Sequence, residues 1–289
     1  MLTIVLVLRK VLPAVIKTIG IVIIVGLAVS WFALLAAMFY GSPFLDFVLP
    51  GRAFFSYLGA FNLFMIIGIP LFSIVLGILR MFFQTRLSKG WRTALGIFWG
   101  INIAGFFLSA ALVGKEFEFD GAVTKVNTPL DITSDTLEVS MFSKDYDTLF
   151  GIDDDHVKLT ENEFVFDNIA VSIKRAEGSE FEFIQVNEAR GISTQLAQEL
   201  AENIEFDYRI EGSHLFLPAF LEVTKAEKFR VQEVNVTLLI PEGKFIRIHR
   251  DVARHQGEIQ KKDTENSVWA SDGNVWVMED EGLVCVDCD

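Results

Sequence analysis

The sequence predicts a two-part membrane protein, in which three transmembrane helices precede an extracytoplasmic, mainly-β domain of solenoid-like or sandwich-like type with one amphipathic helix. Three observations lead to this fold class. The first 114 residues contain three long uncharged stretches, the later residues alternate between apolar and polar positions, and the charges are divided unevenly between these regions. Residues 1–114 contain one acid and eight bases, whereas residues 115–289 contain 37 acids and 17 bases. The net charge of −13 is therefore +7 in the first region and −20 in the second.

The uncharged stretches are residues 18–40, 53–79 and 93–114, which are 23, 27 and 22 residues long. About 20 helical residues are needed to cross the hydrocarbon core of a bilayer. We therefore expect residues 1–17 to form an N-terminal cytoplasmic segment and residues 18–114 to form a three-helix region whose partner is the lipid bilayer. Residues 115–289 are then one acidic, β-rich domain.

The bases between the spans predict the orientation, because short loops rich in Lys and Arg remain cytoplasmic. Three bases precede the first span and four lie between the second and third: Arg9, Lys10, Lys17, Arg80, Arg86, Lys89 and Arg92. The first loop carries only Arg52, beside Asp46. We therefore expect a multi-pass protein of the bacterial inner membrane with a cytoplasmic N-terminus and an extracytoplasmic C-terminal domain.

Few residues inside the spans suggest chemistry. Gly96 and Gly100 form a G-x-x-x-G pattern, which is either a helix-packing face or the ordinary glycine content of membrane helices. Asn62 and Asn102 are amides that need a partner in lipid, and Pro70 predicts a kink rather than a transport site. The spans contain no Asp, Glu, Lys, Arg or His. Since proton relays and ion paths use such residues, a pump or channel is disfavoured.

After residue 114 the alternation of apolar and polar positions predicts at least eight strands. Two turn sequences separate pairs of these strands: residues 241–243, which we expect to close a short hairpin, and residues 271–274. One segment, residues 193–204, has helical periodicity instead. Leu196, Leu200 and Ile204 repeat at every fourth position, so this amphipathic helix is expected to lie on the sheet, with Ser193 or Thr194 as its cap.

Candidate sites in the acidic domain are few. Cys285 and Cys288 form a C-x-x-C, which is compatible with a local disulfide or inert thiols, with adventitious metal affinity, or with a specific function. The run 153–155 of three Asp residues lacks the Gly and Glu spacing of a calcium loop, so a solvated acidic turn is expected. Trp269 and Trp276 are expected to pair across the terminal hairpin rather than to form a ligand surface.

No catalytic, cofactor-binding or metal-binding residues are predicted. The histidines are scattered along the chain and have no nucleophile at a recognisable spacing: they are His156, His214, His249 and His255. Nucleic acid is not expected as a partner, because a net charge of −20 repels a polyanion. The chain is therefore expected not to be an enzyme and to need no cofactor.

The acidic region resembles the C-terminal part of Bacteroidetes-type proteins with a phage-shock-protein-C (PspC) domain. The resemblance rests on residues 187–191 (NEARG), 204–208 (IEFDY), 229–234 (FRVQEV), 239–244 (LIPEGK) and the closing 277–283. It implies several membrane helices before an extracytoplasmic domain of the toast-rack or auto-adhesin-like kind. No separate PspC segment is recognised before the first span, so the chain is expected to be a short relative or a fragment.

Together these features favour a non-enzymatic envelope-stress or membrane-integrity protein that presents a β-rich binding domain outside the cytoplasm. Its outer domain is expected to contact a protein partner or a second copy of itself. The alternative is an adhesive or ligand-binding module that its helices merely anchor, without a signalling role.

Overall fold

The computed structural model describes residues 2–48, 53–83, 88–148, 150–152, 156–224, 226–262 and 273–287. Two compact units make up the chain, Met1–Gly114 and Lys115–Asp289. The predictions made for residues 153–155, for Trp269 and for Cys288 fall outside the described residues.

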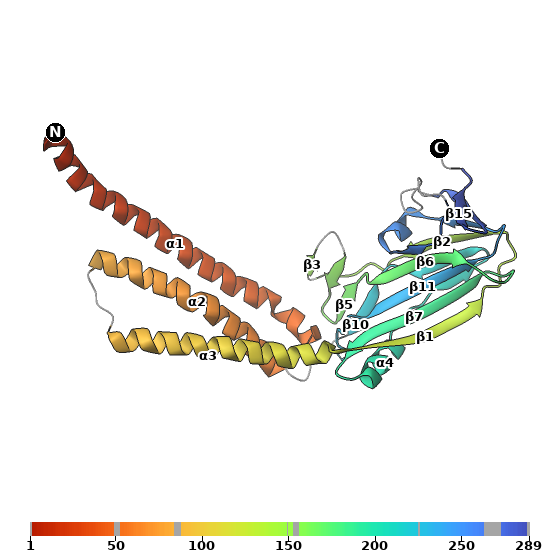
Figure 1. Ribbon diagram of the computed structural model, residues 1–289, viewed down its shortest axis with the longest axis horizontal. Coiled ribbons are helices and arrows are strands. Elements are labelled where there is room, and N and C mark those ends of the chain that lie inside the picture. Colours follow the sequence, from red (N-terminus) through yellow and green to blue (C-terminus); the bar gives the residue numbers. More distant parts are fainter. Residues whose placement is uncertain are drawn as a thin grey trace. The chain divides into compact units, whose positions relative to one another are not determined.

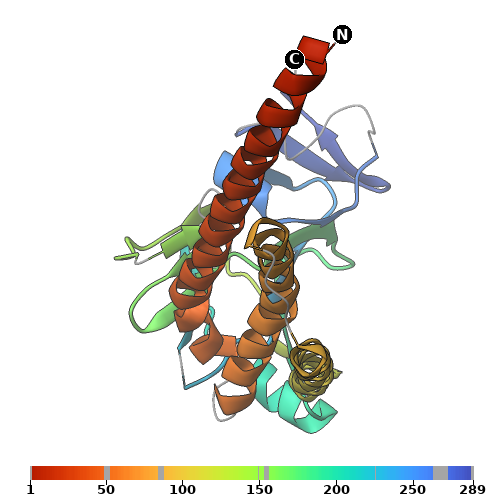
Figure 2. The same ribbon diagram turned by 90° about the vertical axis from the view of Figure 1, so that its left-hand side faces the viewer.

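The first unit consists of three helices, α1 (Leu2–Val48), α2 (Ala53–Phe83) and α3 (Lys89–Gly114). The candidate membrane spans within the described residues are Val15–Ser42, Phe54–Arg80 and Lys89–Phe117, so the three expected spans are confirmed. Helix α1 begins at Leu2 and therefore includes most of the expected N-terminal segment. It diverges from α2 toward its N-terminus (Figures 1 and 2).

The helices approach one another through glycines. A Cβ atom placed at Gly105 of α3 would lie 2.6 Å from Nδ2 of Asn62 in α2, and one placed at Gly59 would lie 3.3 Å from Cβ of Ser109. Between α1 and α2, a Cβ at Gly68 would lie 2.3 Å from the ring of Trp31. Lipid gives helices no hydrophobic reason to associate, so close contact at small residues supplies the packing.

The described residues of the second unit form three sheets. The five-stranded sheet has the order β1 (Phe119–Pro129), β7 (Glu182–Gly191), β11 (Glu233–Ile240), β6 (Ile169–Arg175), β13 (Gln256–Ile259). The six-stranded sheet has the order β15 (Gly282–Cys285), β14 (Val275–Glu279), β12 (Phe245–Ile248), β2 (Thr136–Phe142), β9 (His214–Pro218), β8 (Arg209–Glu211). The four-stranded sheet has the order β10 (Leu221–Thr224), β5 (Glu163–Phe166), β4 (Val157–Leu159), β3 (Phe150–Ile152). The expected mainly-β domain is confirmed.

Each of the two larger sheets buries one face, as the alternation in the sequence predicts. In β11 every second residue is fully buried, from Val234 to Ile240, and β6 buries Val171 and Ile173 on the same face. In the six-stranded sheet the fully buried side chains include those of Leu137, Val139, Leu215, Leu217, Ile246, Trp276 and Met278. Buried aliphatic and aromatic area is the main source of this unit's stability.

The turn at residues 241–243 does not close a hairpin, contrary to the sequence-based expectation. Strand β11 before it pairs with β6 and β7, whereas β12 after it pairs with β2 and β14 of the other sheet. Gly243 adopts a φ of 78°, which glycine tolerates, and the chain turns there from one sheet to the next. Periodicity identified both strands correctly but carries no information about which strands pair.

The amphipathic helix is present as α4 (Thr194–Glu202), with the Ser193 side chain accepting the Leu196 N–H as its cap. Its packed face differs from the expectation. Ala197 and Ala201 are fully buried, whereas Leu196 is 37 % exposed. The reason lies in the sheet beneath, where Gly121 and Gly191 allow the helix backbone to come so close that only alanine fits: a Cβ at Gly121 would lie 2.4 Å from Gln198 N.

Candidate functional site

The first candidate site is the start of the β-rich unit, which follows α3 without a linker. The 3₁₀ turn η1 (Lys115–Phe117) directly succeeds Gly114. Its Glu116 Oε2 accepts a hydrogen bond of 3.1 Å from Nη2 of Arg230, and the Arg230 guanidinium lies 5.0 Å from the Phe117 ring centre. The Arg230 side chain is only 4 % exposed and that of Glu116 is 16 % exposed. This buried ion pair connects η1 to the loop that carries Arg230 within the same unit.

The electrostatics of Arg230 follow from this burial. Loss of solvent lowers the pKa of the guanidinium, and the Glu116 carboxylate acts in the opposite direction. Arginine nevertheless remains charged at all physiological pH values, so removal of Glu116 would take a carboxylate away from a buried cation.

The loop that carries Arg230 is strained and tightly held. Lys228 and Val231 have φ values of 70° and 52°, a region that β-branched residues rarely adopt. The Gln232 side chain accepts the Arg230 N–H at 2.8 Å and donates to the Lys228 carbonyl oxygen at 2.8 Å. Strain of about 1–3 kcal/mol per such residue persists only where the surroundings impose it, and it gathers at functional positions.

The residues that carry the family resemblance hold this region together. Asn187 donates to the carbonyl oxygens of Ala201 and Ile204, each at 3.2 Å, and accepts from Gln185 at 2.8 Å. These bonds fasten the end of α4 to the centre of β7. Asn187, one of the motif residues, therefore has a structural role in these contacts.

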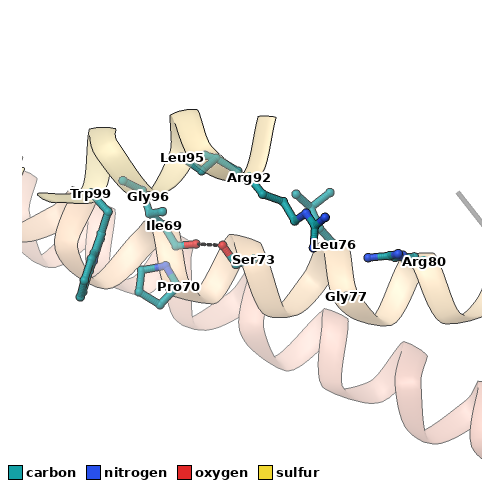
Figure 3. Close-up of a pocket in the computed structure, with 10 residues that line it drawn as sticks. All are labelled: Ile69, Pro70, Ser73, Leu76, Gly77, Arg80, Arg92, Leu95, Gly96 and Trp99. Carbon is teal, nitrogen blue, oxygen red and sulfur yellow. Dashed lines mark hydrogen bonds between the residues drawn. The ribbon is translucent and has the colours of Figure 1, made fainter. Parts of the chain in front are cut away.

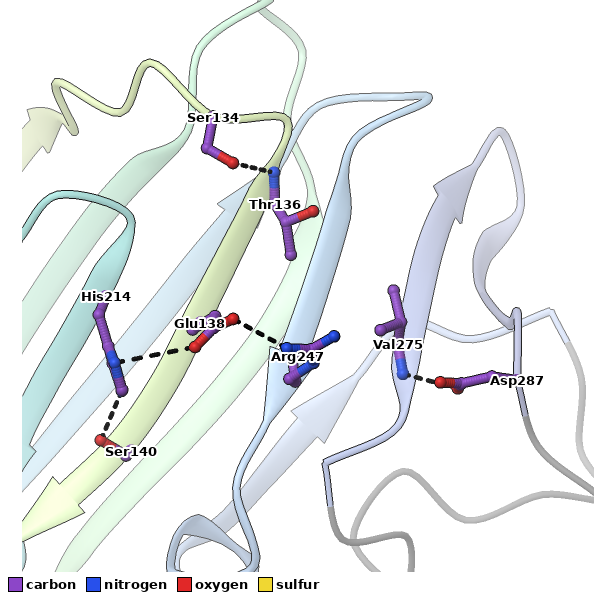
Figure 4. Close-up of polar contacts among 8 residues, drawn as sticks. All are labelled: Ser134, Thr136, Glu138, Ser140, His214, Arg247, Val275 and Asp287. Atoms are coloured by element: carbon purple, nitrogen blue, oxygen red, sulfur yellow. Dashed lines mark hydrogen bonds and ion pairs between the residues drawn. The ribbon is translucent and has the colours of Figure 1, made fainter.

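The second candidate site is a polar row across three adjacent parallel strands of the six-stranded sheet. Glu138 of β2 lies in register with Arg247 of β12 on one side and with His214 of β9 on the other. The neighbouring residues Leu137, Val139, Leu215 and Ile246 point into the core, so the row occupies the opposite, outward face of the sheet. Figure 4 shows the three side chains side by side.

Hydrogen bonds and ion pairs connect the row. Arg247 Nη1 donates to Glu138 Oε1 at 2.9 Å, and Glu138 Oε2 lies 3.8 Å from His214 Nδ1. The other ring nitrogen of His214, Nε2, lies 2.8 Å from the hydroxyl of Ser140 (Figure 4). The His214 ring also stacks on Phe216 with a centroid distance of 4.0 Å.

A second imidazole joins the row from the end of β12. The backbone N–H of His249 donates to Val139 O at 3.0 Å, and its ring lies parallel to that of His214, with centroids 5.5 Å apart. Nε2 of His249 is buried and has no hydrogen-bond partner within the described ranges. One possible ligand atom from each of Glu138, His214 and His249 lies within 4.8 Å of the other two.

The third candidate site is a cavity of about 430 Å³ between α2 and α3 in the membrane unit (Figure 3). Its wall is mostly apolar, from Pro70 and Trp99 at one end past Leu76 and other residues of both helices. Arg80 and Arg92 lie together at the other end, and the described lining includes no acid. An apolar groove with two cations at its end is chemically complementary to an amphiphile with an anionic head group.

Pro70 helps to shape this cavity. Proline has no N–H, so the carbonyl oxygen of Ile66, four residues earlier, lacks its usual helical donor. Nε1 of Trp99 in α3 donates to that oxygen at 3.0 Å. A neighbouring helix thus supplies the bond that proline removes, as hydrocarbon surroundings require.

The sequence-predicted site residues take different positions. Gly96 lines the cavity, but a Cβ placed at Gly96 or Gly100 meets no atom within 4 Å, and the closest approaches between α2 and α3 occur elsewhere. The G-x-x-x-G face therefore stays a prediction for contacts beyond this chain. Cys285 ends β15, while Cys288 lies outside the described residues, so their pairing also stays a prediction.

Sequence reasoning did not find the polar row or the buried Glu116–Arg230 pair. His214 and His249 are 35 positions apart and Glu138 is 76 positions before His214, so no ligand spacing is visible. The available signal is the alternation in residues 214–217 and 245–249, which places both imidazoles on outward positions of strands. Pairing of these strands with β2 then brings them to Glu138.

Residues 156–289 match the family model described as the ToastRack found in some PspC proteins. This match confirms the resemblance seen in the sequence. Residues 156–289 are toast-rack sequence of the kind found in some PspC proteins, and three apolar helices precede them in the chain, a layout that agrees with a membrane protein of the Psp type. No curated protein and no solved structure matches the chain.

Proposed function

We propose that the protein is a non-enzymatic, multi-pass component of the bacterial inner membrane that serves envelope stress response or membrane integrity. In this proposal the N-terminus is cytoplasmic, as the Lys and Arg residues around the spans favour. The toast-rack domain lies outside the cytoplasm and binds a protein partner or a second copy of itself.

The single observation that carries this proposal is the buried attachment of η1 to the domain. Gly114 ends α3, and Glu116, two residues later, is already paired with the 4 % exposed Arg230. A domain that is merely anchored needs only a flexible tether, since its orientation does not matter. A turn held by a buried ion pair and a strained loop would instead pass a tilt or rotation of α3 into the domain.

The membrane unit is proposed to sense the bilayer by binding an anionic lipid in the cavity between α2 and α3. Arg80 and Arg92 would bind the phosphate of the head group, and the apolar wall would hold an acyl chain. To test this, anionic lipid that remains bound to the purified chain is quantified by native mass spectrometry. Arg80→Gln with Arg92→Gln is expected to lower it at least tenfold, whereas Lys89→Gln, at the same end of α3 but outside the cavity lining, should not.

A helix exchange separates the transducer from the anchored adhesive module. Residues 1–114 are replaced by one generic membrane anchor, and the cellular response to envelope stress is recorded together with crosslinks of the outer domain. A transducer loses the stress response while its domain stays folded, whereas an adhesive module keeps its crosslinked partner and its function. Retention of full function with the generic anchor would refute the proposal.

A point variant then tests the junction itself. Arg230→Met removes one partner of the buried pair and should lower the free energy of unfolding by about 3–5 kcal/mol, because Glu116 is left without its cation. Combining it with Glu116→Leu should restore much of the stability while the stress response stays lost. Lys174→Met, in the exposed ion pair of 2.7 Å with Glu258, is the matched control and should change neither property.

A further inference from the structure

The polar row of β2, β9 and β12 has the donor groups of a transition-metal site. We propose that Glu138, His214 and His249 bind one divalent transition-metal ion of the Zn²⁺ class on the outward face of the toast-rack domain. Two imidazoles and a carboxylate are ligands that Zn²⁺ uses in proteins, whereas Ca²⁺ and Mg²⁺ take oxygen ligands almost exclusively. Three protein ligands leave a coordination position for water or for a group from a binding partner.

His214 is held in the orientation that a metal ligand needs. Its Nε2 lies 2.8 Å from the Ser140 hydroxyl, and its Nδ1 faces Glu138 Oε2 at 3.8 Å. When Nε2 carries the proton and donates to Ser140, the lone pair is on Nδ1, on the side of the carboxylate. Metal-binding histidines usually donate their other N–H in this way, which fixes both the tautomer and the ring plane.

The two carboxylate oxygens of Glu138 have different partners. Oε1 accepts the 2.9 Å hydrogen bond from Arg247, and Oε2 is the oxygen nearest the imidazole. Ligating carboxylates are commonly held by such an outer hydrogen bond. The guanidinium is a nearby positive charge that weakens cation binding, but it contacts the oxygen that does not face His214, and the domain as a whole has a net charge of −20.

His249 supplies an imidazole nitrogen whose hydrogen bonding is incomplete. Its Nε2 is buried without a partner among the described residues, and a buried polar atom in that state is destabilising. Coordination of a metal by this ring nitrogen would remove that cost. The residue follows the last residue of β12, Ile248, and precedes the 3₁₀ turn η2 (Arg250–Arg254).

The ring rotation that metal binding requires follows from the distances. The three ligand atoms lie up to 4.8 Å from one another. Bonds of about 2.0–2.1 Å in a tetrahedral zinc site place ligand atoms roughly 3.3 Å apart. Binding therefore requires the His214 and His249 rings, which now lie face to face at 5.5 Å, to turn their nitrogens toward a common point beside Glu138.

The test uses the full chain in detergent without reductant, stripped of metal by a chelator and without a histidine tag. Zn²⁺ binding is measured by calorimetry, and Co²⁺ serves as the spectroscopic probe, since its visible absorption reports nitrogen ligands. We expect one ion per chain. His214→Ala, His249→Ala and Glu138→Gln should each lower the Zn²⁺ affinity more than about 100-fold, and Ser140→Ala, through loss of positioning, about 10-fold.

His156→Ala is the matched control, because His156 lies outside the row and pairs with Asp167. Its Zn²⁺ affinity should equal that of the unchanged protein. Absence of a stoichiometric site, or binding that persists in both His214→Ala and His249→Ala, would overturn the proposal and show only adventitious binding by exposed acids. Circular dichroism confirms that each variant is folded, and Glu138→Gln, which preserves shape, decides the matter if a histidine variant unfolds.

This inference is independent of the proposed transducer role. Glu138→Gln leaves the Glu116–Arg230 pair intact. A loss of metal binding with a normal stress response would therefore show that metal binding and the transducer role are separate properties. Conversely, failure of the helix-exchange experiment would leave the Zn²⁺ measurements unaffected.

Discussion

The membrane unit and the toast-rack domain expose different kinds of side chain. In α3, Ile101 is 62 % exposed whereas its neighbour Asn102 is 3 % exposed. In the domain, Ile173 of β6 is fully buried, and acidic side chains such as Asp120 face solvent at 78 % exposure. The difference reflects the two solvents. Hydrocarbon favours an apolar exterior, so that helices pack on one another through small and polar residues, whereas water favours an apolar core.

The largest effect is expected when the same substitution, Ile→Ala, is made once in each region and the two variants are compared. Ile173→Ala should destabilise the domain by about 2–5 kcal/mol, because it leaves a cavity in a close-packed core. Ile101→Ala should change stability by less than about 0.5 kcal/mol, since lipid fills the space. Thermal unfolding of the full chain in detergent, followed by circular dichroism and protease resistance, measures both. Equal losses for the two variants would show that α3 is covered by protein and not by lipid at Ile101.

A second pair of variants tests packing within the membrane unit. Gly105→Val should destabilise contact between α2 and α3 by about 1–3 kcal/mol, because the new side chain collides with Asn62, 2.6 Å from a Cβ at that position. Gly100→Val, where a Cβ meets nothing within 4 Å, should not. Disulfide crosslinking between cysteines placed in α2 and α3 reports the contact.

The Gly100 variant also sharpens the prediction made for the G-x-x-x-G pattern. If Gly96 and Gly100 form a packing face with another chain, Gly100→Val lowers self-association in detergent while the α2–α3 crosslink persists. A lost α2–α3 crosslink in Gly100→Val would instead contradict the contact geometry described above.

The comparison also explains how far sequence could predict this structure. Span length and alternation depend on the local solvent of each residue, so the three helices, the mainly-β domain and α4 followed from the sequence. Partner choice depends on distant residues. The buried face of α4 is set by Gly121 and Gly191 in the sheet below, and no periodicity within the helix reveals that Ala197 and Ala201 are the packed residues.

The candidate sites were less predictable for the same reason. Glu138, His214 and His249 come together only when β2, β9 and β12 pair in parallel, and those pairings join segments 76 and 109 positions apart. Arg230 likewise meets Glu116 across 114 positions. Arg230 stands between the apolar residues Phe229 and Val231, and this is the one local signal of a buried charge.

A smaller effect is expected where the membrane unit uses a single hydrogen bond. Trp99→Phe removes the donor to the Ile66 carbonyl oxygen and should cost about 0.6–1.7 kcal/mol, the range found for hydrogen bonds between membrane helices. Trp91→Phe, at a 63 % exposed position near the start of the same helix, is the matched control. Unfolding in mixed detergent micelles compares the two, and equal stability would mean that water or lipid satisfies Ile66 as well as Trp99 does.

The last test uses acid, which should act on the domain and spare the helices, because residues 18–40, 53–79 and 93–114 contain no Asp, Glu or His that could take up a proton. Burial lowers the pKa of His255 below its usual value, against the opposing effect of the Asp167 carboxylate. The unfolded chain therefore binds this proton at a higher pH than the folded domain does. Its contribution to stability is constant above the unfolded pKa of about 6.5 and declines as the pH falls from there toward the lowered folded pKa.

At neutral pH the protonation of His255 does not yet change the stability of the domain. Under mild acid we expect a gradual loss of domain stability, the smallest of the four effects predicted in these comparisons. His255→Gln cannot take up the proton, and its unfolding free energy should decline less between pH 7 and pH 5 than that of the unchanged chain. The helical signal of the membrane unit should stay constant over this interval. Identical slopes for the two proteins would mean that His255 gains its proton in the folded domain as readily as in the unfolded chain, and that its burial carries no cost to the charged form.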